Sequence, residues 1–339
     1  MNRFRRTFLG GALGAILAPP LSWGQDRVYR LAWIGRASAG QPAPPPRTPS
    51  QLSPRAIFSE RMRELGFVEQ KNLEIRQFTP KSSTSPADLE ATIRQAVRWK
   101  PDLICVRSVA DTRIAQKVTT EVPIVFSWVG DPVAAGLVQA MARPGGNSTG
   151  VSFYYEGLAV KRLELAREIV PKARRIGVIF DGRTFPGPIK TLEDLRRAAS
   201  ATGLSLEEID IAAGESGVQR ALDRFAGSRP DALLPVGIIY DTRYLERLLD
   251  FQGRARIPIV EDFVEAVEGG ILLGLFEDQR DHFRRAADVA AKVLRGAKPA
   301  SVPVNASTRI NLVVNAKTAK AIGITLPQSV LARADRVIE

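Results

Sequence analysis

The segment from Pro101 to Phe126, PDLICVRSVADTRIAQKVTTEVPIVF, carries the clearest structural signal in the chain. Its two continuous apolar runs, residues 103–106 and 124–126, each follow a proline closely and are typical of buried parallel strands. Between the runs, Ser108 stands three residues before Asp111, an arrangement that favours the first turn of a helix. The segment therefore predicts a strand, a helix and a second strand parallel to the first.

The same alternation extends in both directions from this segment. Further strands are expected at residues 28–35, 73–76, 176–180, 204–209, 232–234 and 257–260, and further helices at 55–65, 86–99, 188–202, 216–227 and 241–252. The pattern is interrupted near Gly150 and then begins again. This restart predicts an α/β protein with two doubly wound parallel-sheet lobes joined by a hinge.

Turn-rich segments set the expected limits of the lobes. Residues 144–147, PGGN, mark a first crossing between lobes, and Gly269-Gly270 marks a return. We expect lobe 1 to comprise residues 25–150 and 275–308, and lobe 2 to comprise residues 151–274 and 309–339. The hinge is expected near residues 147–152 and 269–276, where glycines permit backbone rotation.

The first 24 residues have the features of an export signal. Arg5-Arg6 precedes an apolar run at residues 10–18, which is shorter than the roughly 20 residues that a bilayer requires. Small residues at Ser22 and Gly24 predict cleavage after Gly24. The paired arginines favour a twin-arginine signal, with a general secretory signal as the alternative. We expect a protein exported to a Gram-negative periplasm. It is not expected to be a lipoprotein, because no cysteine lies near the cleavage site.

Composition excludes several kinds of chemistry. The chain of 339 residues has one cysteine, Cys105, and one histidine, His282, which exclude an internal disulfide and a multi-histidine metal site. Neither a metal nor a cofactor is expected. His282 lies among charged residues of a predicted helix, so we expect it to be exposed to solvent. The net charge of +12 comes from scattered arginines, and nucleic-acid binding is not expected.

Ligands of open α/β sheets bind outside the carboxyl ends of the strands, so the loops at those ends supply the candidate site residues. In the first part of the chain these are Ser38, Ser108, Ser127, Trp128 and Asp131. In the second part they are Ser152, Tyr154, Asp181, Tyr240, Asp241, Asp262 and Gly274. Hydroxyl and carboxylate groups suit the polar ends of a small solute, and aromatic rings suit its apolar part.

Each candidate also has a purely structural interpretation. Ser108 is placed to cap the helix that follows it, and Asp131 to cap a helix starting at Val133. Trp128 and the tyrosines are able to pack within the core instead of contacting a ligand. Glu261 and Asp262 are neighbours on an extended chain, so only one of them is expected to face the cleft.

Several longer segments resemble one known family. They are GDPVAAGLV at residues 130–138, RPGGNSTGVS at 143–152 and NLVVNAKTAKAIG at 311–323, together with the last residues, 331–339. In this order they resemble the ABC transporter substrate-binding proteins of the group that includes tryptophan- and tyrosine-binding members. The resemblance implies a type I periplasmic-binding fold and covers nearly all of the chain after the export signal.

The resemblance also implies a function and some site residues. It implies a monomeric binding protein that captures a small organic solute, such as an aromatic or branched-chain amino acid, between its lobes. The partner is then an ABC importer permease in the inner membrane. Ser108, Asp131, Ser152 and Asp241 match positions of the family's motifs. Gly274-Leu275 departs from the family's Tyr-Gly, so the identity of the solute does not carry over.

Three alternatives share parts of this pattern. A ligand sensor without a permease has the same fold and is not distinguished by sequence. A periplasmic hydrolase requires a nucleophile activated by His282 or by a carboxylate. The Gly-x-Ser-x-Gly pattern at residues 146–150 leads into a predicted strand and does not open a helix, so it is not expected to form a nucleophile elbow. A transcription regulator of this fold requires a helix-turn-helix before the first strand, where the export signal lies instead.

Overall fold

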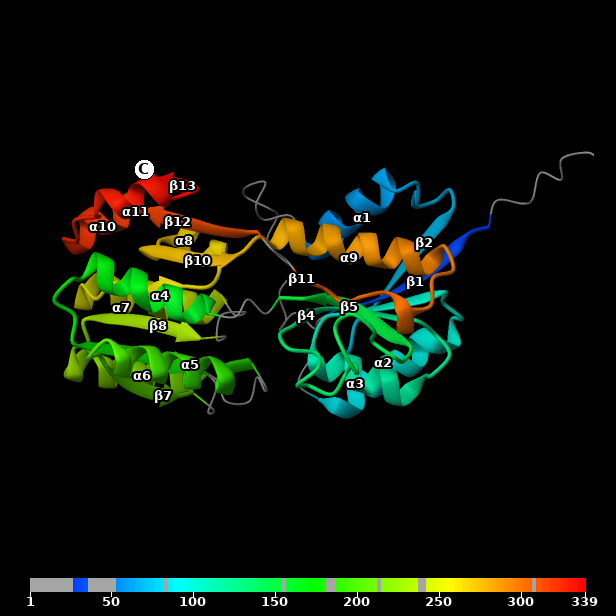
Figure 1. Ribbon diagram of the computed structural model, residues 1–339, viewed down its shortest axis with the longest axis horizontal. Helices are drawn as coiled ribbons and strands as arrows, with labels where there is room; N and C mark the ends of the chain where they lie inside the picture. The colour runs from blue at the N-terminus through cyan, green and yellow to red at the C-terminus, as the bar shows by residue number, and fades with distance from the viewer. Residues whose placement is uncertain are drawn as a thin grey trace, which may run out of the picture.

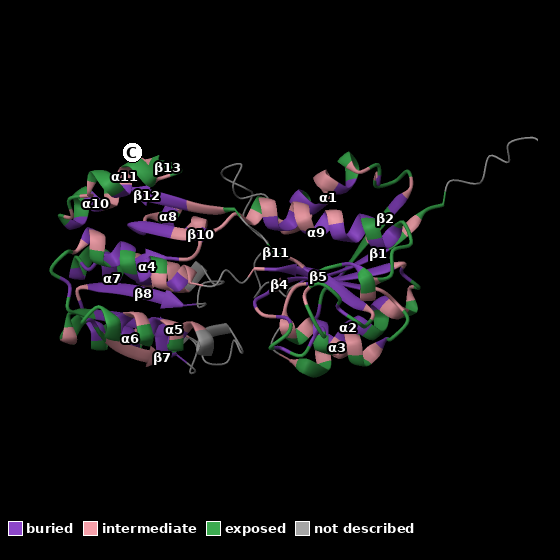
Figure 2. Cartoon of the chain, in the orientation of Figure 1, coloured by how far each residue is buried: buried purple, intermediate pink, exposed green. Residues whose placement is uncertain are grey.

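The computed structural model describes residues 27–35, 53–81, 85–153, 157–180, 187–211, 215–236, 242–306 and 309–339. Figure 1 shows two α/β lobes lying next to each other along the long axis of the molecule. The strands of each lobe are mostly buried, and the exposed positions concentrate on the outer faces of the helices (Figure 2). Among the described helices, none is long and apolar enough to cross a membrane.

Lobe 1 is built on a parallel sheet with the strand order β11-β5-β4-β3-β1-β2. The strands are β1 (Tyr29–Ile34), β2 (Leu73–Phe78), β3 (Leu103–Val106), β4 (Ile124–Val129), β5 (Ser148–Ser152) and β11 (Asn305–Ala306). The helices are α1 (Pro54–Glu64), α2 (Pro86–Arg98), α3 (Val109–Val118) and α9 (Gln279–Leu294), with a short 3-10 helix, η2 (Pro299–Ser301). Helices α1 and α9 cover one face of the sheet and α2 and α3 the other, each with its own apolar core.

Lobe 2 contains two described sheets, β7-β6-β8 and β13-β12-β10-β9. Their strands are β6 (Arg175–Phe180), β7 (Ser205–Asp210), β8 (Ala232–Val236), β9 (Val260–Glu261), β10 (Leu273–Glu277), β12 (Ile310–Asn315) and β13 (Arg336–Ile338). The Leu233 N–H donates to the Pro258 carbonyl at 2.9 Å and joins the two sheets beside β9. Strand β12 runs antiparallel to β10, so lobe 2 is parallel except at this pair.

Helices cover both faces of lobe 2. They are α4 (Leu158–Ile169), α5 (Gly187–Ala201), α6 (Glu215–Ser228), α7 (Thr242–Ala255), α8 (Val264–Gly269), α10 (Ala316–Ile322) and α11 (Gln328–Arg333). The side chains of α4, α5 and α10 share one apolar core, and those of α6 and α7 share another. The predicted α/β architecture with two helix-covered lobes is confirmed.

The described chain passes between the lobes in three places. It leaves lobe 1 after β5, returns between β10 and α9, and leaves again between β11 and β12. The expected lobe limit at residues 274/275 falls inside β10, which stays paired with β12 up to Glu277. The expected lobe limit at 308/309 lies between β11 and β12, although the predicted hinge named only the first two passages. The lobe limits themselves remain a proposal.

Two local predictions need correction. The helix expected from Val133 is a set of hydrogen-bonded turns over residues 132–136. It ends after one turn because Gly136 has a φ of 66° and turns the backbone away from the helical path. The strand expected at 257–260 is reduced to Val260–Glu261, with a single bridge to Leu233 at Ile259.

Candidate functional site

Five rings from both lobes gather at the end of β4. This aromatic cluster consists of Trp128, Phe153, Phe263, His282 and Phe283. The Trp128 ring centroid lies 5.7 Å from that of Phe153, 5.5 Å from that of His282 and 6.0 Å from that of Phe283. Phe263 follows β9 in lobe 2 and stacks on Trp128 at 6.3 Å with an interplanar angle of 27°. The aromatic cluster therefore connects the lobes at the ends of their strands.

Trp128 has an unusual backbone conformation. Its φ of 54° lies in the left-handed region, which bulky residues rarely adopt. Its N–H donates to Nε2 of His282 at 3.2 Å, and the ladder between β4 and β5 is irregular between Phe126 and Val129. Strained residues of this kind persist where surrounding contacts hold them and are frequent at functional sites.

His282 corrects the prediction of a solvent-exposed histidine, because its exposed fraction is 2%. Its Nδ1 lies 2.7 Å from Oε1 of Glu277, the last residue of β10. Since Nε2 accepts the Trp128 N–H, Nδ1 carries the ring proton and donates it to Glu277. The charged neighbours of His282 in the sequence were misleading, because the helix face that it shares with Ala286 packs against lobe 1.

A buried ion pair lies beside the aromatic cluster in lobe 2. Nη1 of Arg162, on α4, lies 2.8 Å from Oδ2 of Asp262, and the two side chains are 6% and 20% exposed. Glu261 is fully buried, and one of its oxygens, Oε2, accepts the Asp262 N–H at 2.7 Å. Burial, with the neighbouring Asp262 charge, raises the pKa of Glu261 well above its ordinary value.

Ser108 is the N-cap of α3. Its Oγ accepts the Asp111 N–H at 3.0 Å, as the sequence predicts. In return, the Asp111 carboxylate accepts the Arg107 N–H at 3.3 Å. At the start of α3, the Ser108 hydroxyl and the Asp111 carboxylate therefore already accept backbone N–H groups.

Four other candidates make internal contacts. The hydroxyls of Ser127 and Ser152 donate to the carbonyl oxygens of Val106 and Gly130, and both serines are buried. Asp131 Oδ1 accepts the N–H groups of Val133 and Ala134 at 3.0 and 2.9 Å, so it caps a turn. Gly274 lies in β10, where a Cβ atom would approach Cγ2 of Val267 to 2.8 Å. These internal contacts give each of the four residues a structural role.

The remaining candidates lie outside the described residues. They are Ser38, Tyr154, Asp181, Tyr240 and Asp241. Sequence reasoning did not select Arg162 or Phe263. The available signal for Phe263 was its position directly after the acidic pair at the end of a predicted strand, and Arg162 had no comparable signal.

The metal-ligating residue types and the cysteine are further candidate groups for the site. Among the described residues, no group of three or more His, Cys, Asp and Glu side chains is arranged to hold a metal ion. Cys105 is buried in β3, and burial raises the pKa of its thiol far above the ordinary value. Such a thiol is a poor nucleophile because the thiolate is the reactive form.

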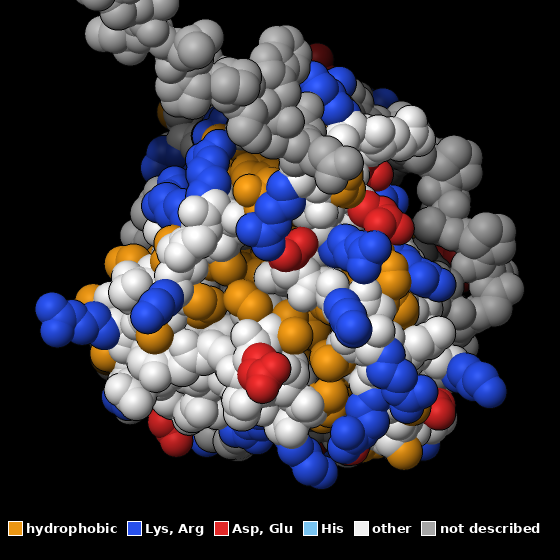
Figure 3. All heavy atoms as spheres, turned by 90° about the vertical axis from the view of Figure 1, so that its right-hand side faces the viewer, with side chains coloured by type: hydrophobic (Ala, Val, Ile, Leu, Met, Phe, Trp, Pro, Cys, Tyr) orange, Lys and Arg blue, Asp and Glu red, His pale blue; other side chains and the backbone are white. Residues whose placement is uncertain are grey.

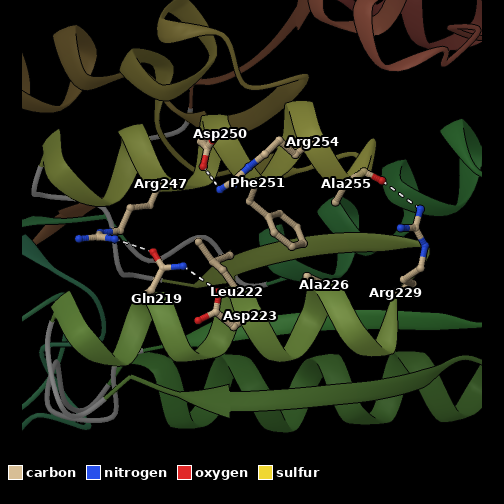
Figure 4. Close-up of a pocket in the computed structure, with 10 residues that line it drawn as sticks. All are labelled: Gln219, Leu222, Asp223, Ala226, Arg229, Arg247, Asp250, Phe251, Arg254 and Ala255. Carbon is tan, nitrogen blue, oxygen red and sulfur yellow. Dashed lines mark hydrogen bonds and ion pairs between the residues drawn. The ribbon is translucent and has the colours of Figure 1, made fainter.

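A groove of about 280 Å³ lies between α6 and α7 and shares no residue with the aromatic cluster (Figure 4). Its polar side chains bind one another, since Arg247 donates to Gln219 at 2.5 Å and Gln219 donates to Asp223 at 2.8 Å. Arg229 donates to the Ala255 carbonyl at 3.2 Å. These contacts explain the groove as packing between two helices.

Charged side chains are dispersed over the end of lobe 1 that faces away from lobe 2. Figure 3 shows Lys and Arg spread over the end of lobe 1, with acidic and apolar groups between them. Several of the arginines join α9 to α1, as in the contacts of Arg284 with Glu64 at 2.7 Å and of Arg280 with Glu60 at 2.9 Å.

Two helix-covered α/β lobes joined by three chain passages define the type I periplasmic-binding fold. The family model for ABC transporter substrate binding proteins matches residues 47–338, and the chain belongs to this family. The members of the family are solute-binding proteins and not enzymes.

Individual proteins are similar to this chain in sequence or in fold. The tyrosine-binding protein of Clostridioides difficile is 27% identical over 277 residues, which cover 81% of this chain and 77% of the relative. A conserved domain protein from Vibrio cholerae is 27% identical, with a TM-score of 0.78 over 92% of this chain and 100% of that chain. An ABC domain from Streptococcus pneumoniae, solved in complex with L-Trp, is 24% identical, with a TM-score of 0.79 and the same coverage.

Proposed function

We propose that this protein captures an aromatic amino acid between its lobes and delivers it to an ABC importer. The observation that carries the proposal is the stacking of Trp128 on Phe263, because it supplies aromatic surface from both lobes at one place. A planar side chain is a suitable partner for such rings. The tyrosine-binding relative and the L-Trp complex of a structural neighbour support the same class of solute.

Binding would work through the relative stability of two arrangements of the lobes. A solute that contacts both lobes favours the closed arrangement by its additional contacts there. The three chain passages act as the hinge. Two of them are joined, since the Asp278 N–H donates to the Arg309 carbonyl at 2.8 Å and Nε of Arg309 lies 3.3 Å from Oδ2 of Asp278. These contacts would make the two passages move together.

The remaining parts of the proposal concern location and partners. The protein is exported, its signal peptide is removed after Gly24, and the mature chain works in the periplasm as a monomer. The closed, loaded form docks on the permease of an importer in the inner membrane. The solute is released chemically unchanged, and no covalent step is involved.

A thermal-shift screen of the mature chain tests the proposed solute class. The panel contains L-Trp, L-Tyr, L-Phe, L-Leu, L-Ile, L-Val and aromatic carboxylic acids. A ligand at about 100 times its dissociation constant stabilises the native state by about 2.7 kcal/mol, which raises Tm measurably. We expect the largest shift from L-Trp or L-Tyr. No shift from any aromatic amino acid, confirmed by calorimetric titration, would refute the proposed solute class.

A further inference from the structure

The surroundings of the Arg162–Asp262 ion pair contain polar atoms with no hydrogen-bond partner among the described residues. These atoms are Nη1 of Arg162, which contacts Asp262 as an ion pair only, Oδ1 of Asp262 and Oε1 of Glu261. Arg162 is 5% exposed and Glu261 is fully buried. Buried polar atoms usually have a hydrogen-bond partner, and each one without a partner costs free energy. One guanidinium nitrogen and two carboxyl oxygens without a hydrogen-bond partner lie in one small region, and they have unused capacity to bind a polar group.

This charged group borders the aromatic cluster. Asp262 directly precedes Phe263, whose ring stacks on Trp128 of lobe 1. Arg162 lies on α4, the first helix after the chain leaves lobe 1, and α4 packs against β9 and β10. A solute whose ring contacts the aromatic cluster would therefore have its polar end near Arg162 and Asp262.

The charges in this group balance. Arg162 and Asp262 carry opposite charges, and burial keeps the Glu261 carboxyl protonated to a higher pH than usual. An α-amino acid is also neutral overall, with a carboxylate and an ammonium group close together. A simple aromatic acid would bring an uncompensated negative charge toward Asp262, and a simple amine would bring a positive charge toward Arg162.

We infer that Arg162, Glu261 and Asp262 form a headgroup site for a zwitterionic α-amino acid. The guanidinium of Arg162 binds the carboxylate of the solute, and the Asp262 carboxylate accepts its ammonium group, while the protonated Glu261 carboxyl adds a neutral hydrogen-bonding group beside them. The start of α3, the other place suited to a carboxylate, is already capped by Ser108 and Asp111. The inference rests on the proposed function and adds to it the part of the site that recognises the amino-acid backbone.

Calorimetric titration with three indole compounds tests the headgroup site. L-Trp has both charges, tryptamine has only the ammonium group, and indole-3-propionate has only the carboxylate. We expect the mature wild-type protein to bind L-Trp at least about ten-fold more tightly than either of the others. The test variant is R162M/D262N, because R162M alone leaves the Asp262 charge buried without a partner. We expect this variant to lose at least about ten-fold in L-Trp affinity and to distinguish the compounds by less than about three-fold.

Two further variants separate local effects from folding. The control R196M/E208Q removes the exposed Arg196–Glu208 pair between α5 and β7 and should bind L-Trp like the wild type. R162K keeps the positive charge but removes the planar fork. It should lose L-Trp affinity by about five-fold or more and leave tryptamine affinity unchanged. R162K therefore keeps the test decisive if R162M/D262N does not fold.

The outcomes distinguish the headgroup site from the proposed function. If the wild type binds L-Trp and folded R162M/D262N keeps the same affinities, the headgroup site is refuted and the proposed function stands. Unchanged L-Trp affinity in R162K refutes the headgroup site in the same way. If the wild type binds no aromatic amino acid, the proposed function itself fails.

Discussion

The indole of Trp128 and the ring of Phe263 lie 6.3 Å apart at an interplanar angle of 27°, although they belong to different lobes. Trp128 is in β4 of lobe 1, and Phe263 follows β9 of lobe 2. Because the two residues are far apart in the sequence, their contact reports how the lobes meet. In the proposed function, it is also the contact through which a solute ring would influence both lobes.

Removal of the Phe263 ring should weaken binding of aromatic amino acids. F263A loses one aromatic face of the aromatic cluster, and aromatic pairs contribute about 0.5–1.5 kcal/mol beyond area burial. We expect an affinity loss of about ten-fold for L-Trp by calorimetric titration, and a smaller loss in F263L, which keeps apolar volume. Equal L-Trp affinity in the wild type and both variants would remove Phe263 from the site.

His282 should contribute to stability through the two hydrogen bonds of its ring. H282A leaves the Trp128 N–H without its acceptor and Glu277 without its donor. Unsatisfied buried groups cost about 1–3 kcal/mol each, so the free energy of unfolding should fall by about 2–4 kcal/mol in urea denaturation. E277Q retains an acceptor for Nδ1 and should lose about 1 kcal/mol or less. A stability of H282A within about 0.5 kcal/mol of the wild type would contradict the geometry.

The raised pKa of Glu261 predicts a specific pH dependence. The unfolded chain loses this proton near the ordinary value of 4.5, and the folded protein keeps it to higher pH. Between these two values the free energy of unfolding falls as pH rises, by about 1 kcal/mol per pH unit. E261Q removes this titration and keeps an acceptor for the Asp262 N–H.

Urea denaturation at several pH values measures this difference. E261Q should match the wild type near pH 4 and become more stable than the wild type as pH rises toward 8. The comparison at each pH uses the same ionic strength, because charges at the surface also titrate. If the difference in the free energy of unfolding between the two proteins does not change with pH, the pKa of Glu261 is the same in the folded and unfolded states, and the predicted upward shift is refuted.

Gly150 should be intolerant of substitution. A Cβ atom at this position of β5 would overlap the carbonyl oxygen of Phe126 in the neighbouring strand β4. G150A should therefore reduce the free energy of unfolding by about 3 kcal/mol in urea denaturation. At nearby Gly146 a Cβ atom would meet no other atom within 4 Å, and G146A should be close to neutral. Similar stability of both variants would contradict the close approach of β4 and β5.

Local sequence signals predicted much of the fold. The cap of α3 at Ser108 and the start of α2 at Pro86 follow from residues within one helical turn. The apolar runs that became β3 and β4 were recognisable because both faces of a parallel strand are buried. The short helix expected after Asp131 was wrong, since a single glycine ended it.

The candidate site was less predictable, for a physical reason. Side chains that end strands were identifiable, but their partners were not, because those partners come from other parts of the chain. Ser127 and Ser152 hold neighbouring strands by hydrogen bonds to carbonyl oxygens, which the sequence does not distinguish from solute binding. Asp262 was selected without Arg162, which lies in a helix with no pattern that marks a charged contact.

The amino-acid sequence by itself determined the helices and most strands, the two-lobed α/β class and the family, because these depend on local periodicity, caps and the order of motifs. Only the tertiary structure decided that His282 is buried against Trp128, that Arg162 neutralises Asp262 and that β12 runs antiparallel to β10. These features arise from contacts between residues far apart in the chain. Packing of the whole molecule creates such contacts, and no single segment encodes them.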